Sequence, residues 1–173
     1  FSEFGLIRSR VEIEVAWLLA LAAEPAIAEV PPFDDATRDA LAAAVRDFAP
    51  ADAARVKAIE RTTNHDVKAV EYWMKERFAH VPSIARVAEF IHFACTSEDI
   101  NNLAHALALA AARREVLLPV LRDVAALRAG APAEALVHPD AAERLAPLAS
   151  GRLGERATHL AERAGEARYA LRG

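Results

Sequence analysis

Two short polar runs, RTTNHD at residues 61–66 and CTSED at residues 95–99, carry the side chains whose types and spacing could do chemistry. Each run interrupts an apolar pattern and leads directly into a new helical pattern, so free backbone N–H groups and short polar side chains gather at a helix N-terminus. Such a terminus binds anions, because its N–H groups and the helix dipole favour negative charge. Two of them placed together predict a site for a substrate with several negative charges, such as a phosphate or a dicarboxylate.

His65 is the most suggestive side chain of the first run, since it stands between Asn64 and Asp66 at the expected start of a helix. The positive end of the helix dipole disfavours a protonated imidazole, so we expect His65 to act as a neutral hydrogen-bonding partner. The alternative is that Asn64 or Thr63 caps the helix and that His65 is merely exposed.

Thr96 and Ser97 in the second run pair their hydroxyls with free N–H groups, which suits the binding of a carboxylate or a phosphate. Ordinary capping of the next helix explains the two residues equally well. Thr96 followed three residues later by Asp99 is a variant of the capping box. Asn101 and Asn102, one turn further on, are expected to hydrogen-bond between helices.

Other polar residues give weaker signals. His92, Cys95 and His105 could be metal ligands, but no repeated Cys or His pair has zinc-finger spacing, so we predict no metal site and a helix contact for His92. Lys68 and Glu71, three residues apart, are expected to pair on the surface. The sequence contains no phosphate-binding glycine loop, nucleophile elbow or dinucleotide fingerprint, and no cofactor is expected.

The composition predicts an all-α protein with a sizeable core. The chain has 173 residues, 54% of them hydrophobic, and a net charge of −4, with abundant alanine and only 6 glycines. Its 21 Lys and Arg residues are dispersed among 25 Asp and Glu, which argues against nucleic-acid binding. No apolar run reaches the roughly 20 residues that span a bilayer. A single cysteine makes the reducing cytosol the expected compartment, so we predict a cytoplasmic protein.

Apolar residues that recur at three- and four-residue steps predict the helices that position the two runs. They cover residues 3–23, a segment capped by Asp34 or Asp35, a segment from Pro50 to near Arg61, and residues 66–78, 83–94 and 98–128. In the first helix the charged residues at 8, 10, 12 and 14 are expected mostly on faces away from the apolar stripe. Pro119 is expected to kink the last helix, which at about 45 Å would be a strut of an elongated bundle or an inter-subunit core.

Two segments resemble a known family. ERTTNHDVKAVEYWMKERF (60–78) and EFIHFACTSEDINNLAHALAL (89–109) closely resemble the adenylosuccinate lyases, which are members of the fumarase and aspartase superfamily, and FSEFGLIRSRVEIEVAWL (1–18) resembles the first long helix of that family. The likeness covers roughly residues 1–128. It implies an all-helical homotetramer with active sites assembled from several subunits. Residues 1–94 would then form an amino-terminal helical domain, and residues 95–128 the start of a central long-helix bundle of the fumarase/aspartase type.

The resemblance implies a reaction and a set of binding residues. The reaction is the elimination of fumarate from adenylosuccinate to give AMP, and from the succinyl-carboxamide ribotide SAICAR to give AICAR. A base removes a proton beside a carboxylate, an acid protonates the departing nitrogen, and hydrogen-bond donors stabilise the intermediate. Asn64, His65 and Asp66 match the family's substrate-binding Asn-His-Asp motif. Thr96 and Ser97 match its Thr-Ser pair.

The family's catalytic groups are not found in this sequence. The family's general acid is a histidine in a Thr-His-Gly motif and its base a serine in a Ser-Ser-x-Met-Pro-x-Lys-x-Asn loop, and neither motif occurs. We therefore expect a fragment, inactive alone, with sequence missing before Phe1. Residues 129–173 match no part of the family, as expected for a reading frame that slips near Ala129 or for a divergent end. Within this segment the sequence indicates helices at 141–145 and 152–172. The competing hypothesis is a non-catalytic helical module that oligomerises through residues 98–128 or joins a full-length lyase.

Overall fold

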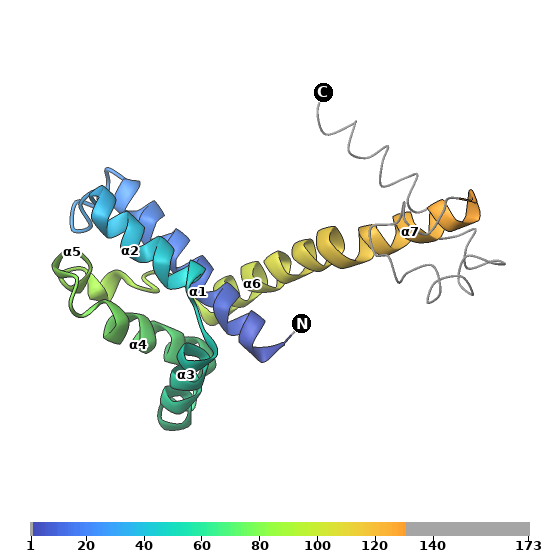
Figure 1. Cartoon of the computed structure of the whole chain (residues 1–173). Coiled ribbons are helices and arrows are strands. Elements are labelled where there is room, and N and C mark those ends of the chain that lie inside the picture. Colours follow the sequence, from blue (N-terminus) through green and yellow to red (C-terminus); the bar gives the residue numbers. More distant parts are fainter. Residues whose placement is uncertain (1, 131–173) are drawn as a thin grey trace. The chain divides into compact units, whose positions relative to one another are not determined.

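The computed structural model describes residues 2–130, and this part of the chain is helical and contains no β-strand (Figure 1). The all-α prediction is confirmed. The elements are α1 (Glu3–Ala23), α2 (Asp35–Arg46), α3 (Pro50–Thr63), α4 (Asp66–Phe78), α5 (Pro82–Ala85), the 3-10 turn η1 (Ala88–Phe90), α6 (Ser97–Ala112), the π-helical segment η2 (Arg113–Leu117) and α7 (Leu118–Arg128). The chain divides into two units, Phe1–Ala108 and Leu109–Gly173. The helices predicted within 131–173 lie outside the described residues.

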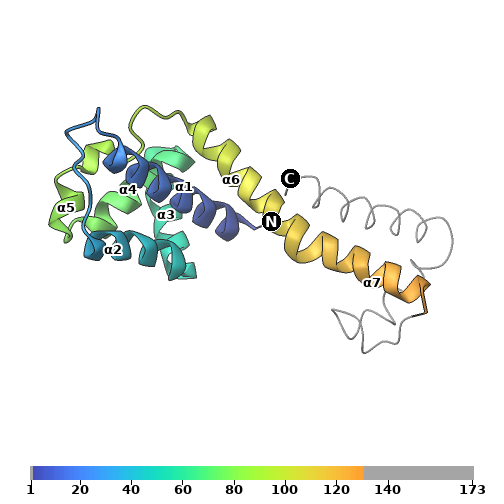
Figure 2. The same cartoon turned by 90° about the horizontal axis from the view of Figure 1, so that it is seen from above.

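Helix α1 is the element around which the first unit is built, because it packs against α2, α3 and α4 (Figures 1 and 2). Its inward face repeats at three- and four-residue steps and buries Ile7, Val11, Val15, Leu18, Leu21 and Ala22. Each fully buried side chain of the size of Leu18 stabilises the fold by about 1.5–3 kcal/mol. Ser2 caps the helix, since its Oγ accepts a hydrogen bond from Gly5 N at 3.1 Å.

Three charged side chains in this unit are buried, which the sequence analysis did not foresee. Arg10 and Glu14 on α1 are 7% and 0% exposed, so the prediction that they lie on outer faces is wrong. They fall at three- and four-residue steps from Ile7, which places them on the inward face. Lys68 pairs with Glu71 as predicted, at 2.7 Å between Nζ and Oε2, but Glu71 is buried rather than on the surface and also binds Lys75.

Helices α2, α3 and α4 form close to their predicted positions. Asp34 caps α2, because its Oδ1 accepts a hydrogen bond from Thr37 N at 2.8 Å. Helix α3 begins at Pro50, where proline suits the first turn, and it ends at Thr63 rather than near Arg61. The predicted inward stripe of α4 is buried in full; it consists of Val67, Val70, Met74 and Phe78. These helices hold the first polar run between the end of α3 and the start of α4.

The helix predicted over residues 83–94 is not formed, and this prediction is wrong. Only α5 and η1 occur there, and His92 and Ala94 adopt left-handed backbone conformations with φ of 65° and 57°. A left-handed residue ends a right-handed helix. Val87 and Ile91, which are four residues apart, are both buried, and this spacing gave the segment its helical periodicity. Ala94, which was expected to be buried, is exposed.

The long helical pattern at 98–128 is observed from Ser97 to Arg128 as α6, η2 and α7 without an intervening loop. The five π-helical residues Arg113–Leu117 lie directly before α7, whose second residue is Pro119. Proline has no N–H to donate to the carbonyl four residues earlier, which explains why the regular hydrogen-bond pattern changes here. Among the described helices, none combines the length and the apolar character needed to cross a membrane.

Candidate active site

The chain reverses from α3 to α4 through Asn64 and His65. Asn64 ends α3 in the left-handed conformation, with φ of 52°, which asparagine tolerates better than most residues. His65 then caps α4 with its own side chain, because Nδ1 accepts a hydrogen bond from Lys68 N at 3.2 Å. The alternative in which Asn64 or Thr63 caps α4 is therefore wrong. Thr63 instead donates its hydroxyl to the His65 carbonyl oxygen at 3.2 Å.

The cap determines which nitrogen of His65 carries the proton. A ring nitrogen that accepts an N–H carries no proton, so in the neutral imidazole the proton is on Nε2. Nε2 lies 3.3 Å from Oγ of Ser97, which then accepts a hydrogen bond from the imidazole. The separation of 3.7 Å between Nδ1 and Asp66 Oδ1 is not an ion pair in this tautomer. The structure thus brings the two polar runs together within one chain.

Thr96 and Asp99 organise the start of α6. Asp99 Oδ2 accepts hydrogen bonds from Thr96 N at 2.7 Å and from Thr96 Oγ1 at 2.8 Å. The carboxylate thus makes the capping-box contact that was predicted, but the Thr96 hydroxyl donates to Asp99 instead of accepting from its N–H. These backbone and hydroxyl bonds lower the pKa of Asp99. Because Thr96 is engaged with Asp99, the Ser97 hydroxyl is the one that faces His65.

Asp66 is held by a buried arginine that the sequence analysis missed. Arg10 donates from Nη2 to Asp66 Oδ2 at 2.6 Å and from Nε to Asn101 Oδ1 at 2.9 Å, while Asp66 Oδ1 accepts from Val67 N at 2.8 Å. Burial alone would raise the pKa of Asp66, but the Val67 N–H and the Arg10 charge outweigh it and lower the pKa. The expected interhelical bond of Asn101 is present, and Asn102 is exposed.

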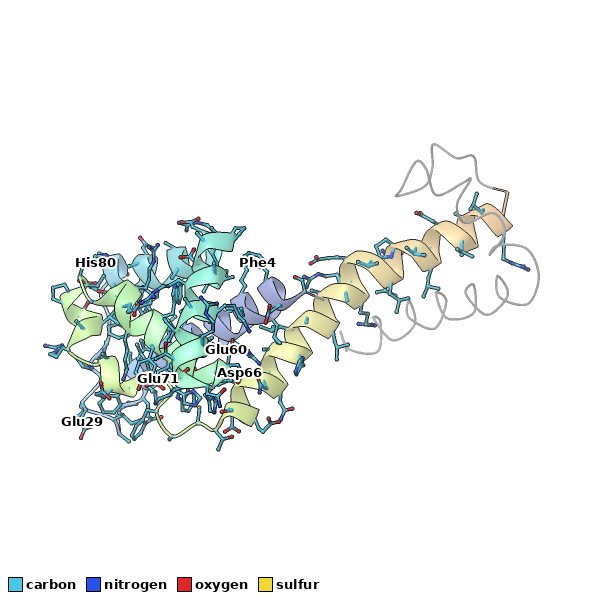
Figure 3. All side chains as sticks on the ribbon, turned by 90° about the horizontal axis from the view of Figure 1, so that it is seen from below. Phe4, Glu29, Glu60, Asp66, Glu71 and His80 are labelled. Atoms are coloured by element: carbon cyan, nitrogen blue, oxygen red, sulfur yellow. The ribbon has the colours of Figure 1, made fainter. Side chains whose placement is uncertain are left out.

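A hollow of about 490 Å³ opens beside these residues. It is lined by Lys57, Glu60, Arg61, Asn64, His65 and Asp66. Figure 3 labels two of these residues, Glu60 on α3 and Asp66 at the start of α4. Lys57 is paired with Glu3 and Glu60, each at 2.7 Å. The hollow therefore offers the Asn64–Asp66 turn and the Arg61 side chain to a polar ligand.

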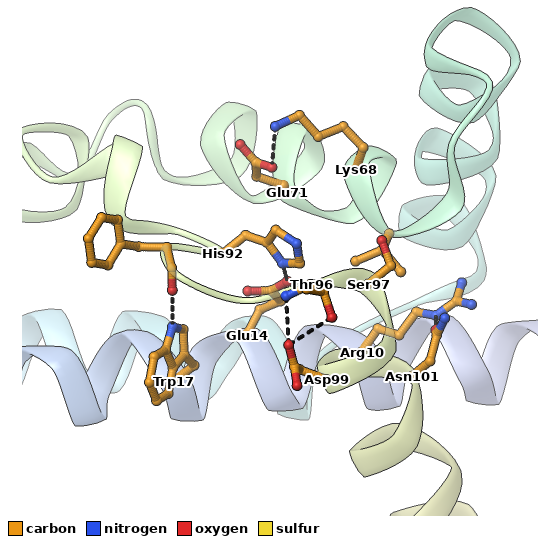
Figure 4. Close-up of polar contacts among 12 residues, drawn as sticks. Arg10, Glu14, Trp17, Lys68, Glu71, His92, Thr96, Ser97, Asp99 and Asn101 are labelled. Atoms are coloured by element: carbon orange, nitrogen blue, oxygen red, sulfur yellow. Dashed lines mark hydrogen bonds and ion pairs between the residues drawn. The ribbon is translucent and has the colours of Figure 1, made fainter.

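His92 makes the structural contact that was expected of it, with Glu14 on α1 at 2.6 Å between Nδ1 and Oε1 (Figure 4). Burial raises the pKa of the Cys95 thiol, with the charges of Glu14 and Asp99 adding to the effect. His105 is exposed. Within residues 2–130, no group of three or more His, Cys, Asp or Glu side chains is placed to hold a metal ion.

At this site a histidine, a serine hydroxyl and two helix N-termini meet within an all-α unit. Such a unit is what the first part of a lyase of the fumarase and aspartase superfamily was expected to contain. The chain belongs to the lyase family, whose family model matches residues 1–136.

The relatives that it matches are adenylosuccinate lyases. The chain is 60% identical to that of Escherichia coli (strain K12) over 124 residues, which is 72% of this chain and 27% of the relative. It is 60% identical to the enzyme of Haemophilus influenzae over 119 residues, which is 69% of this chain and 26% of the relative. It is 44% identical to the enzyme of Legionella pneumophila (strain Corby) over 124 residues, which is 72% of this chain and 27% of the relative. The chain thus spans about a quarter of the length of these relatives.

Proposed function

We propose that this chain supplies the substrate-binding part of a lyase that eliminates fumarate from adenylosuccinate, giving AMP, and from SAICAR. The observation that carries the proposal is the contact between His65 Nε2 and Ser97 Oγ at 3.3 Å, which brings the two polar runs together. The identity of 60% to the E. coli adenylosuccinate lyase over 124 residues supports the choice of substrate.

In this proposal the described residues bind and orient the substrate rather than transfer its protons. The hydroxyl of Ser97, which accepts the Nε2–H of His65, and the free N–H groups at the start of α6 donate to substrate carboxylate or phosphate oxygens. Asn64 and Asp66, which line the hollow, would complete the binding surface. Thr96, whose hydroxyl donates to Asp99, would hold the start of α6 in place beside them. The sequence has no Thr-His-Gly motif, so the acid and the base would come from groups other than these.

A chimera tests the proposed function directly. Residues 1–128 of this chain would replace the matching segment of the E. coli relative, so that the relative supplies the sequence on both sides, and the loss of adenylosuccinate absorbance would be followed. We expect turnover by the chimera, none by the chain of 173 residues alone, and a loss of about tenfold or more in kcat/KM in the His65→Ala chimera, as for the removal of one strong hydrogen bond. A folded chimera with no activity would contradict the proposal.

A second candidate function rests on exposed apolar side chains of the second unit. Leu109, Val116 and Leu117 are 61%, 61% and 53% exposed, and their spacing of seven and eight residues is typical of one apolar helix face. They favour a non-catalytic module that associates through this helix. Light scattering on the purified chain, with titration of AMP and fumarate, separates the two functions: association without ligand binding would favour the module.

A further inference from the structure

One face of α1 carries three polar contacts to the candidate site. Arg10, Glu14 and Trp17 stand four and three residues apart, so they project from the same side of the helix. Figure 4 shows all three pointing from α1 toward the segment that carries His92, Thr96 and Ser97. Each of them contacts a different point of residues 92–101. We call these three residues the α1 template.

Trp17 and Glu14 hold the turn that leads into the CTSED run. Trp17 Nε1 donates to the Phe93 carbonyl oxygen at 2.8 Å, and Glu14 Oε1 lies 2.6 Å from His92 Nδ1. His92 and Ala94, on either side of Phe93, are the two left-handed residues of this turn. A left-handed conformation is unfavourable for residues other than glycine, so tertiary contacts must maintain it. The template supplies those contacts.

Glu14 is unusual because it is fully buried and only half paired. Its side chain has no exposed surface, and Oε2 accepts no hydrogen bond from the described residues. A buried carboxylate with one partner contributes little net stability compared with an apolar side chain of similar size. What it does contribute is a fixed position for His92, and through it a fixed path for the chain toward Ser97.

Arg10 is the member of the template that contacts both the first polar run and α6, the helix that follows the second run. Its guanidinium binds Asp66, the residue after His65, and Asn101, four residues after Ser97 on α6. The planar fork of arginine fixes the relative position of two acceptors in a way that the single ammonium of lysine does not. The helix N-termini that carry His65 and Ser97 are therefore tied to the same side chain.

We propose that the α1 template positions the candidate site, with Arg10 setting the contact between His65 and Ser97. The three residues are positioning residues, which act through the two runs rather than on a substrate. The inference rests on the proposed function in one respect, since it takes the His65–Ser97 pair to be the substrate-binding pair. The geometry of that pair can be measured without any substrate.

The first arm of the test is spectroscopic and uses the chain itself. Nitrogen-15 NMR of the His65 imidazole reports its tautomer, which is protonated on Nε2 when Lys68 N and Ser97 Oγ are both bound. We expect this tautomer in the native chain and a mixture of tautomers in Arg10→Lys and in Trp17→Phe. The control is Arg46→Lys, because Arg46 pairs with its exposed neighbour Asp47 and should leave the His65 signals unchanged. Circular dichroism selects the variants that fold.

A native His65 spectrum in whichever of Arg10→Lys and Trp17→Phe fold would overturn the proposal. The second arm places Arg10→Lys in the chimera and measures KM and kcat separately. We expect KM to rise about tenfold with a smaller change in kcat, because the altered group affects binding rather than proton transfer. If the chimera is inactive with the native residue, the proposed function fails, whereas the spectra still decide whether Arg10 positions His65.

Discussion

The imidazole Nε2 of His65 lies 3.3 Å from the hydroxyl oxygen of Ser97, although 32 positions separate the two residues in the sequence. His65 caps α4, and Ser97 is the first residue of α6, so the contact joins two helix N-termini. Both ends carry the positive ends of helix dipoles, and at α4 the N–H groups of Val67 and Lys68 are bonded by the side chains of Asp66 and His65. An anion bound at this contact would be favoured by both helices at once.

His65 has two roles that substitution can separate. Asparagine is a good N-cap, so His65→Asn should keep the stability of α4, whereas His65→Ala should lower the free energy of unfolding by about 0.5–1 kcal/mol. Neither variant can donate from Nε2 to Ser97, so both should lose anion binding. Urea denaturation measures the first effect and ligand titration the second. Equal stability of the two variants would show that His65 does not stabilise α4 as a cap. Retained anion binding would show that the Nε2 donor of His65 is not needed.

Asp66 should make the chain sensitive to acid. Its folded pKa lies below the ordinary value of 3.8, because the Val67 N–H and Arg10 outweigh the effect of burial. The stabilisation is therefore present above about pH 3.8 and is lost as the pH falls through the folded pKa. The native chain should exceed Asp66→Asn in unfolding free energy near neutral pH, and the difference should shrink on acidification. A difference that stays constant from about pH 7 to pH 3 would contradict this reading.

The effect of Glu14 on stability should depend on pH in the opposite sense to that of Asp66. Burial raises the pKa of Glu14 above its ordinary value of 4.5, although the hydrogen bond and charge of His92 lower it, and the nearby Glu71 adds to the rise. As the pH rises through the interval above 4.5, the unfolded chain releases its proton first, so the native state loses stability. The unfolding free energy of Glu14→Gln minus that of the native chain should grow with pH through this interval. A difference that falls with pH would show that the His92 partner dominates.

Ala94 pays a conformational penalty that glycine would relieve. Its φ is 57°, and its side chain is exposed, so Ala94→Gly should raise the free energy of unfolding by about 0.5 kcal/mol after the greater entropy of the unfolded glycine is included. Ala106→Gly, at an exposed position inside α6, is the matched control and should lower it by about 1 kcal/mol. Thermal denaturation of the two variants should give shifts of opposite sign, and a loss of stability in Ala94→Gly would contradict the strained turn.

The helices that depend on local periodicity could be predicted from the sequence. Residues 3–23 and 66–78 were predicted at their observed bounds, because each carries a continuous apolar stripe with a clear start and stop signal. The segment 83–94 could not, because its turn at His92 and Ala94 is maintained by contacts with α1 that are distant in sequence. Local pattern carries no information about such contacts.

The same distinction applies to the candidate site. The polar runs were visible as helix starts, and the contact between His65 and Ser97 agrees with the expectation that they face one site. Arg10 was missed, because charged residues on a helix are usually assigned to the solvent face. Its spacing of three residues from Ile7 and four from Glu14 placed it on the inward face, and that signal could have identified it.

The most direct measurement is an NMR titration of the chain with fumarate and with AMP, following the amide signals of residues 65–68 and 96–99 together. If the two helix N-termini form one anion site, both groups of signals should shift with a single dissociation constant, and both shifts should disappear in His65→Asn. Shifts confined to one run, or two runs with different dissociation constants, would contradict the shared site.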